Sequence, residues 1–328
     1  MGYSVAIRTL GKAGEKYDKL LKSIERSVRK PDRVIVVLPT GYPIPSSKLG
    51  YEQYVFCEKS MIRQRIEALN YIDSEYTLFL DDDIEFDPDF VDKILKPLET
   101  NLYDCSTGPL FSFFPTSLAG KIAGTLTASV SISVFRRDMY VKILRSGGWS
   151  YHTFDTSIEH YYPTESFAWT CFAIRTEVMR AIHMEDEVVW LERFGYASGD
   201  DRVMAYKLIK NGYKACVVGN APYVHNDAKS STSKEEMHSD LPKFCMYYMH
   251  TVFWHRFIQD PETEAFRRLQ NSLCFSYWKV MSTGYHLAKI LLKKDDGRKY
   301  RAFLSGIREG QRYVKSPEYS LLKPMRRV

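Results

Sequence analysis

The sequence predicts an α/β fold, a doubly wound and mostly parallel sheet covered by helices, followed by a helical extension at the C-terminal end. Two observations lead to this prediction. Short, nearly all-apolar runs such as residues 33–38 are typical of strands buried on both faces of a parallel sheet, and helical periods alternate with them. The 328 residues, 45% hydrophobic and 26% charged, suffice for a large core and exclude a disordered or fibrous chain.

Strand and helix patterns alternate over the range 1–110. Strands are expected at residues 4–10, 33–38 and 76–80, and helices at 16–29, at 60–71 and from residue 87 onward. The first helix is expected to bury one apolar face made of Tyr17, Leu20, Leu21, Ile24 and Val28. Asp87 is the expected cap of the third helix, with Pro88 in its first turn.

The pattern weakens between residues 112 and 165, where we expect loops, one uncertain helix and a functional surface. Regular elements then return, with strands at 167–174 and 214–218 and helices at 176–183 and 200–211, the last stopped by Gly212. A polar linker at 227–236 leads into helices near 243–258, 262–292 and 298–313. A boundary is therefore expected near residue 227.

The two ends of the chain carry opposite charge. From residue 243 onward there are 17 Lys and Arg against 7 Asp and Glu, a net of +10, which leaves −4 for residues 1–242 because the whole chain carries +6. Basic helices with aromatic residues, here between Phe244 and Phe257, are typical of binding to an anionic membrane surface. The alternative is that these helices pack on the rest of the chain. Because no nucleic-acid motif accompanies the charge, no nucleic-acid partner is expected.

Three further features bear on location. The N-terminal residues do not resemble a secretory signal, and no apolar run reaches the roughly 20 residues of a membrane span. Six cysteines are scattered without a Cys-x-x-Cys pair, which favours buried reduced thiols. We expect a cytoplasmic protein. If it binds a membrane, we expect it to do so as a peripheral protein at the inner face.

The strongest chemical signal is an apolar strand that delivers Asp81, Asp82 and Asp83 at its C-terminal end. Ligands bind at that edge of open α/β sheets. Adjacent carboxylates repel one another unless they share a cation, and Asp81 and Asp83 are spaced to reach one divalent ion. A solvated acidic turn is the alternative, but the buried strand favours a metal site.

Two more segments carry candidate residues. Gly199 precedes Asp200 and Asp201 at the start of a helix. One Asp suffices to cap the helix, so the other is a candidate general base. His225 follows a strand and a proline. A single His is often structural, so its role as a ligand rests on its place after the other two segments.

In this order and spacing, the three segments resemble the family 2 glycosyltransferases of the A-type (nucleotide-diphospho-sugar transferase) fold. The resemblance covers residues 3 to about 227. It implies that the strand ending in Asp81 is the metal- and diphosphate-binding motif and that Asp201, with Asp200, is the catalytic pair. It also implies donor contacts from Arg65, with Arg63 as an alternative, and from Thr9.

The sequence departs from the family pattern at several positions. Asp200 and Asp201 replace a Glu-Asp pair, Lys207 replaces a common Arg, and no acid follows the second strand to contact the nucleotide base. The signature and membrane spans of processive synthases are missing, which favours the addition of a single sugar.

The resemblance implies a metal-dependent, inverting transferase that moves one sugar from a nucleotide-diphospho-sugar to a glycan or lipid-linked acceptor. Mn²⁺ or Mg²⁺ would be held by Asp81, Asp83 and His225, and the donor by Thr9, Arg65, Asp81 and Asp82. Residues 1–227 would form the catalytic domain, with a donor half at 1–110 and an acceptor half at 111–227, and 228–328 a helical extension. A sugar-phosphate nucleotidyltransferase and a non-catalytic binding protein are the alternatives.

Overall fold

A computed structural model describes residues 2–133, 138–227 and 240–325. The chain forms two compact units that interleave along the sequence. The first unit contains residues 1–111, 154–188 and 213–233, and the second contains 112–153, 189–212 and 234–328. The C-terminal helices therefore belong with two earlier segments, whereas the sequence analysis placed a single boundary near residue 227. The functional roles assigned to the predicted halves stay predictions, and most of the predicted linker lies outside the described residues.

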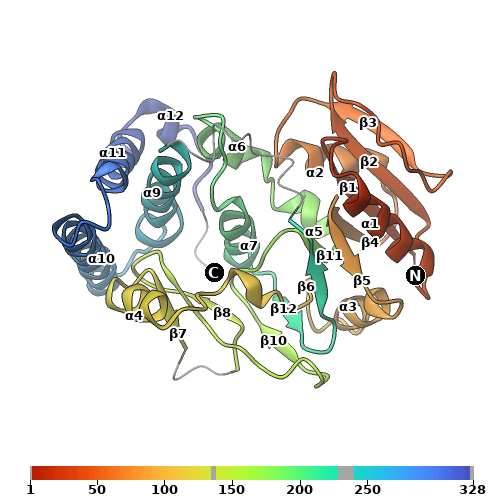
Figure 1. The fold of residues 1–328 in the computed structure, drawn as a ribbon, viewed down its shortest axis with the longest axis horizontal. Coiled ribbons are helices and arrows are strands. Elements are labelled where there is room, and N and C mark those ends of the chain that lie inside the picture. The colour runs from red at the N-terminus through yellow and green to blue at the C-terminus, as the bar shows by residue number, and fades with distance from the viewer. Residues whose placement is uncertain (1, 134–137, 228–239, 326–328) are drawn as a thin grey trace. The chain divides into compact units, whose positions relative to one another are not determined.

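The first unit is built on an eight-stranded sheet in the order β10-β12-β6-β11-β4-β1-β2-β3 (Figure 1). Strands β12 and β6 are parallel, as are β4, β1, β2 and β3, while β11 and β10 run antiparallel to their neighbours. The strands are β1 (Tyr3–Arg8), β2 (Arg33–Pro39), β3 (Gln53–Cys57), β4 (Tyr76–Asp81), β6 (Cys105–Thr107), β10 (Tyr161–Pro163), β11 (Cys171–Arg175) and β12 (Ala215–Val218). The predicted α/β class with a mostly parallel sheet is confirmed.

Helices cover this sheet because its strands are apolar on both faces. The helices are α1 (Glu15–Arg26), α2 (Arg63–Ala68, continued by a 3-10 turn at Leu69–Tyr71), α3 (Phe90–Glu99) and α5 (Thr176–Ala181). The apolar faces of α1 and α3 pack in one cluster with alternate residues of β1, β2 and β4. On the other face, the rings of Phe79 and Phe172 stack with centroids 5.0 Å apart. The period-two alternation of the strands thus fills two layers of core.

Two local predictions for the first unit were wrong, and one strand was not predicted. The apolar signal of β3 in the sequence is weak, because its residues alternate in exposure, with Val55 buried and Phe56 46% exposed. Helix α1 ends at Arg26, so Val28 lies beyond its apolar face and is 70% exposed. Helix α3 begins at Phe90 after Asp89, so Asp87 is not its cap.

The second unit is mainly helical. Its helices are α4 (Leu118–Leu126), α7 (Asp200–Lys210), α9 (Leu241–Trp254, continued by a π-helical turn at His255–Gln259), α10 (Ala265–Leu291), α11 (Arg298–Tyr313) and α12 (Pro317–Ser320); α6 (Glu185–Leu191) runs from residues of the first unit into those of the second. A small sheet pairs β7 (Val130–Ile132) and β8 (Val141–Ile143) with β9 (Trp149–Tyr151). The three C-terminal helices lie close to their predicted bounds.

Aromatic rings of the C-terminal helices make the core of the second unit. Trp254, Phe275, Trp278, Phe303 and Ile307 form one buried cluster. The α9 and α11 backbones approach closely, since a Cβ at Gly306 would come within 2.6 Å of a carbonyl oxygen of α9. Across the described ranges, we find no helix with the length and apolar character needed to cross a membrane.

We expect Trp278→Ala to lower the free energy of unfolding by about 3–5 kcal/mol, because the indole is 2% exposed, stacks on His250 and donates a hydrogen bond to Ser129. Val280→Ala is the matched control: it lies on the same helix but is 68% exposed, so its effect should stay within about 0.5 kcal/mol. Urea denaturation followed by far-UV circular dichroism measures both, and equal losses would contradict the orientation of α10.

Candidate functional site

Three adjacent carboxylates lie at the carboxyl ends of neighbouring parallel strands in the first unit. Strand β4 ends at Asp81, which is in register with Arg8 at the end of β1. Asp81, Asp82 and Asp83 are each only 6% exposed. The alternative of a solvated acidic turn is therefore wrong. Because an unpaired buried carboxylate costs several kcal/mol, the surrounding residues must compensate these charges.

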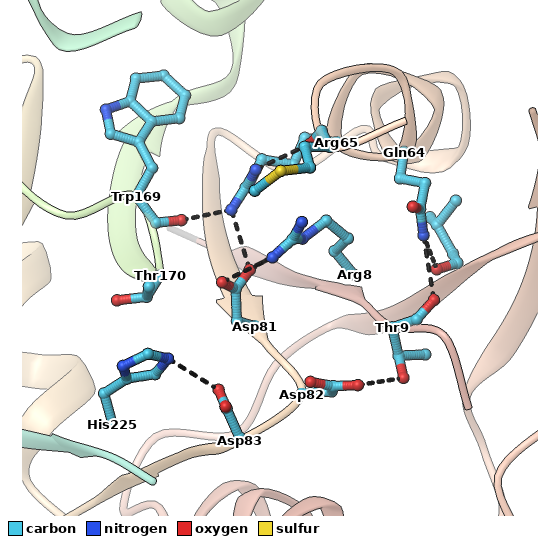
Figure 2. Close-up of polar contacts among 12 residues, drawn as sticks. Arg8, Thr9, Gln64, Arg65, Asp81, Asp82, Asp83, Trp169, Thr170 and His225 are labelled. Atoms are coloured by element: carbon cyan, nitrogen blue, oxygen red, sulfur yellow. Dashed lines mark hydrogen bonds and ion pairs between the residues drawn. The ribbon is translucent and has the colours of Figure 1, made fainter. Parts of the chain in front are cut away.

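Asp81 is compensated by two arginines (Figure 2). Arg8 donates from Nε and Nη2 to the two carboxylate oxygens at 3.1 and 2.9 Å, a bidentate pair. Arg65 Nη2 donates to Asp81 Oδ1 at 2.9 Å and to the Trp169 carbonyl oxygen at 2.7 Å. The Arg65 side chain is 4% exposed, so this network is shielded from water. Asp81 is thus held by β1, α2 and the segment before β11 at once.

Asp82 is held by the end of β1. Its Oδ2 accepts a hydrogen bond from Thr9 Oγ1 at 2.6 Å, and Thr9 Oγ1 in turn accepts one from the Gly11 amide at 2.9 Å. Gln64 Nε2 donates to the carbonyl oxygens of Thr9 and Val37, which joins the ends of β1 and β2. Burial is the main reason that the pKa of Asp82 rises to about 6; the charges of Asp81 and Asp83 add to it, while Thr9 opposes the shift.

Asp83 faces His225. The Asp83 Oδ1 and His225 Nε2 atoms are 3.3 Å apart. The contact exists because β5 (Ile84–Phe86) pairs antiparallel with β13 (Tyr223–His225), and the Asn226 amide donates to the Asp83 carbonyl oxygen at 2.9 Å. Burial alone lowers the pKa of His225, but its hydrogen bond to Asp83 and the nearby carboxylates outweigh burial and raise that pKa. A carboxylate and an imidazole are thereby brought to one point from segments that are far apart in the sequence.

This donor pair suits a divalent cation such as Mn²⁺, which accepts oxygen and imidazole ligands. In the parts of the chain that the structure describes, no group of three or more His, Cys, Asp or Glu side chains is arranged to hold a metal ion. The predicted ligand Asp81 instead has both oxygens in the arginine network. Only Asp83 and His225 of the predicted trio therefore face each other.

The structure separates the two arginines that the sequence analysis considered. Arg65 reaches Asp81, whereas Arg63 lies 3.6 Å from Glu58 with a side chain that is 52% exposed. Arg8 and Gln64 were missed. The parallel pairing of β1 with β4 could have revealed Arg8, because both strands end at the same edge; nothing in the sequence pointed to Gln64.

Asp200 and Asp201 belong to the second unit, at the first two positions of α7. Gly199 precedes them with φ 71°, a left-handed conformation that favours glycine, and the next side chains carry the negative charge that suits a helix N-terminus. Asp201 Oδ1 accepts a hydrogen bond from the Arg202 amide at 2.7 Å. The Arg202 guanidinium lies 4.9 Å from the Phe253 ring centroid and donates to the Gly147 carbonyl oxygen at 2.7 Å. These contacts fix the start of α7 within its own unit.

Comparisons with known proteins agree on this architecture. Residues 54–180 match the model of the family described as glycosyl transferase family 2. No curated protein sequence is significantly similar to the chain. Among solved structures, S. aureus TarS 1–349 in complex with UDP-GlcNAc is 12% identical, with a TM-score of 0.52 over 98% of this chain and 84% of that one. GalNAc-T7 with UDP, GalNAc and Mn²⁺ is 10% identical, with a TM-score of 0.50 over 86% of this chain and 55% of that one.

At these identities the solved structures show a shared fold, that of the A-type glycosyltransferases, and the family model adds the sequence evidence. The motif that ends in Asp83 lies inside the matched residues. The chain is a glycosyltransferase of the A-type fold, and its residues 54–180 are similar to the family 2 model.

Proposed function

We propose that the protein is a metal-dependent, inverting glycosyltransferase that moves one sugar from a nucleotide-diphospho-sugar to a hydroxyl of a glycan or lipid-linked acceptor. The observation that carries the proposal is the buried cluster at the ends of β1 and β4, where carboxylates, two arginines and a histidine meet. The solved structures of similar fold hold UDP-GlcNAc or UDP with Mn²⁺, which supports a nucleotide-linked donor and a divalent cation here. Surface polysaccharide or glycolipid synthesis is the setting we infer.

The donor would be bound by the β1 side of the cluster. Arg8 and Arg65 share one carboxylate, Asp81, so the three groups together carry one positive charge, and guanidinium donors suit phosphate oxygens. Asp81 fixes the orientation of both guanidinium groups, so we assign it the role of positioning Arg8 and Arg65 for the donor. Asp82 and Thr9 are kept as residues that contact the donor. The donor base is not assigned.

The cation would be held by Asp83 and His225, with Mn²⁺ or Mg²⁺ as candidates. When bound, it would neutralise the charge that develops on the departing diphosphate. The imidazole of His225 is kept next to Asp83 by the β5 and β13 pairing, so two ligands are preorganised without the cation. Asp81 as a third ligand remains an untested prediction, and we leave it out of the proposal.

Asp201 would act as the general base. It takes the proton of the acceptor hydroxyl while the acceptor oxygen forms a bond to C1 of the sugar and the bond from C1 to the diphosphate oxygen breaks. Direct displacement of this kind inverts the anomeric centre. Asp200, 8% exposed and first in α7, would support the start of the helix.

Binding of a panel of nucleotides with and without Mn²⁺ tests the proposal against its alternatives. A glycosyltransferase should bind nucleoside diphosphates and their sugar conjugates better when Mn²⁺ is present. A sugar-phosphate nucleotidyltransferase should prefer a nucleoside triphosphate. Enzymes of that class usually have a Gly-rich, basic loop after the first strand, and here only Gly11, Lys12 and Gly14 resemble it. No nucleotide binding at all would favour a non-catalytic protein.

We expect Asp83→Asn to reduce transfer by about 10²-fold or more, because a neutral amide is a poor ligand for a divalent cation. Asp82→Asn is the matched control, since its amide oxygen still accepts the hydrogen bond from Thr9, and its loss should be smaller. Isothermal titration with Mn²⁺ alone gives a readout independent of turnover. Unchanged Mn²⁺ affinity in Asp83→Asn would show that this carboxylate is not a ligand.

Asp201→Asn should keep donor and Mn²⁺ affinity but lose about 10² to 10⁴ in rate, the usual effect of removing a general base. Rate and donor affinity are measured separately, by product formation at saturating substrates and by equilibrium binding. Asp200→Asn serves as the neighbouring control. A large loss in Asp200→Asn with little change in Asp201→Asn would transfer the role to Asp200.

A further inference from the structure

Helix α10 of the second unit has a buried inner face and an exposed outer face that is apolar. The inner face buries Asn271, Phe275, Trp278, Ser282 and His286 at spacings of three and four residues. On the opposite face lie large apolar side chains that are 47–82% exposed: Phe266, Leu269, Leu273, Tyr277, Val280 and Leu291. At about 1.5 Å per residue, the 27 residues of α10 carry this stripe for about 40 Å. A single exposed leucine needs no explanation, but a stripe of this length does.

Helix α4 extends the stripe into a broader surface. Leu118, Ile122 and Leu126 follow one another at spacings of four residues and are 73%, 51% and 53% exposed. The end of α4 adjoins the middle of α10, since the Tyr277 hydroxyl donates to the Leu126 carbonyl oxygen at 2.9 Å (Figure 1). We call these exposed residues of the two helices the α4–α10 surface.

The sequence around the α4–α10 surface contains no acidic residue. The ranges 112–137 and 265–294 include no Asp or Glu, although these two residue types supply 40 of the 328 residues of the chain. Six cations lie in the second range, namely Arg267, Arg268, Lys279, Lys289, Lys293 and Lys294. The acids that flank this range are ion-paired: Glu264 with Arg267, Asp295 with Lys299 and Asp296 with Arg298. Four of the six cations are exposed, Arg267 and Arg268 at one end of α10 and Lys293 and Lys294 at the other, so the apolar stripe is positive at both ends.

The aromatic residues expected to meet a membrane do not lie on this surface. No residue from Phe244 to Phe257 is exposed, and Val252, Phe253 and Phe257 are fully buried. They hold α9 in the core of the second unit. The sequence expectation that these residues add an apolar contact with lipid is therefore wrong, and the exposed apolar side chains of α10 and α4 are the candidates instead.

We propose that the α4–α10 surface docks on an anionic lipid bilayer, with its apolar side chains in the interface and its cations at the head groups. An apolar stripe bordered by Lys and Arg is the pattern of interfacial helices. Each cation near an anionic surface adds attraction, and Lys293 and Lys294 are exposed directly after Leu291, the last residue of the stripe. Association of two copies through α10 fits less well, because it would bring two acid-free, cationic surfaces together.

The test uses the full chain and vesicles of phosphatidylcholine with or without phosphatidylglycerol, in a co-sedimentation assay across a salt series. Leu273→Glu with Val280→Glu should reduce binding to anionic vesicles at least about tenfold, because burial of one such side chain is already worth that factor. Val28→Glu is the control. Val28 is 70% exposed but lies in the first unit, so this variant should bind anionic vesicles as the wild type does. Rising salt should weaken wild-type binding, since it screens the cations.

Circular dichroism checks that each variant folds, and Leu273→Ser, which adds no charge, replaces the double variant where that one does not fold. Sedimentation velocity checks for a second copy. Three results would overturn the proposal: equal binding to neutral and anionic vesicles at low salt, equal losses in the control and the double variant, or a dimer that the double variant dissociates without any vesicle binding.

Discussion

The first unit depends on the neutralisation of three adjacent carboxylates that are almost completely withdrawn from water. Removing one partner of a buried ion pair costs about 3–5 kcal/mol, which is a large part of the stability of a typical domain. The partners of Asp81 come from β1 and α2, and that of Asp83 comes from β13. Each of these elements must therefore be in place for the others to be stable, and the site and the fold are stabilised together.

Each of the three carboxylates has a different partner. Asp81 is locked between two guanidinium groups, Asp82 is bound by a hydroxyl, and Asp83 faces an imidazole, although the three are consecutive in the chain. Only Asp81 belongs to β4. Asp82 and Asp83 form the turn that leads into β5, and in that turn the three side chains face different partners. A motif of identical residues thus contacts an arginine pair through Asp81 and a histidine through Asp83.

The sequence predicts features that depend on neighbouring residues, and it does not predict features that depend on contacts between distant segments. The acidic strand end, the α/β alternation and the three C-terminal helices follow from patterns within single elements and their immediate neighbours, and they were found. Arg8 depends on the register of two strands that are distant in the sequence, and the interleaved units depend on contacts between distant segments, so neither could be read from periodicity. Strand β3, half exposed, gave a pattern too weak to identify.

The C-terminal helices differ in which of their apolar residues are exposed, and the sequence did not predict this difference. Both α9 and α10 are rich in apolar residues, and from the sequence the aromatic one looked the better candidate for lipid. Large rings gain most from burial, however, and α9 accordingly fills the core with Phe253 and Trp254. Helix α10 places Phe275 and Trp278 on the same inner side, while Phe266, Tyr277 and several aliphatic residues lie on the outer face. The absence of acids along 265–294 then distinguishes this outer face from an ordinary solvated one, because a helix face that meets only water is usually charged. A surface that is apolar along its length and positive at both ends matches an anionic bilayer in both respects.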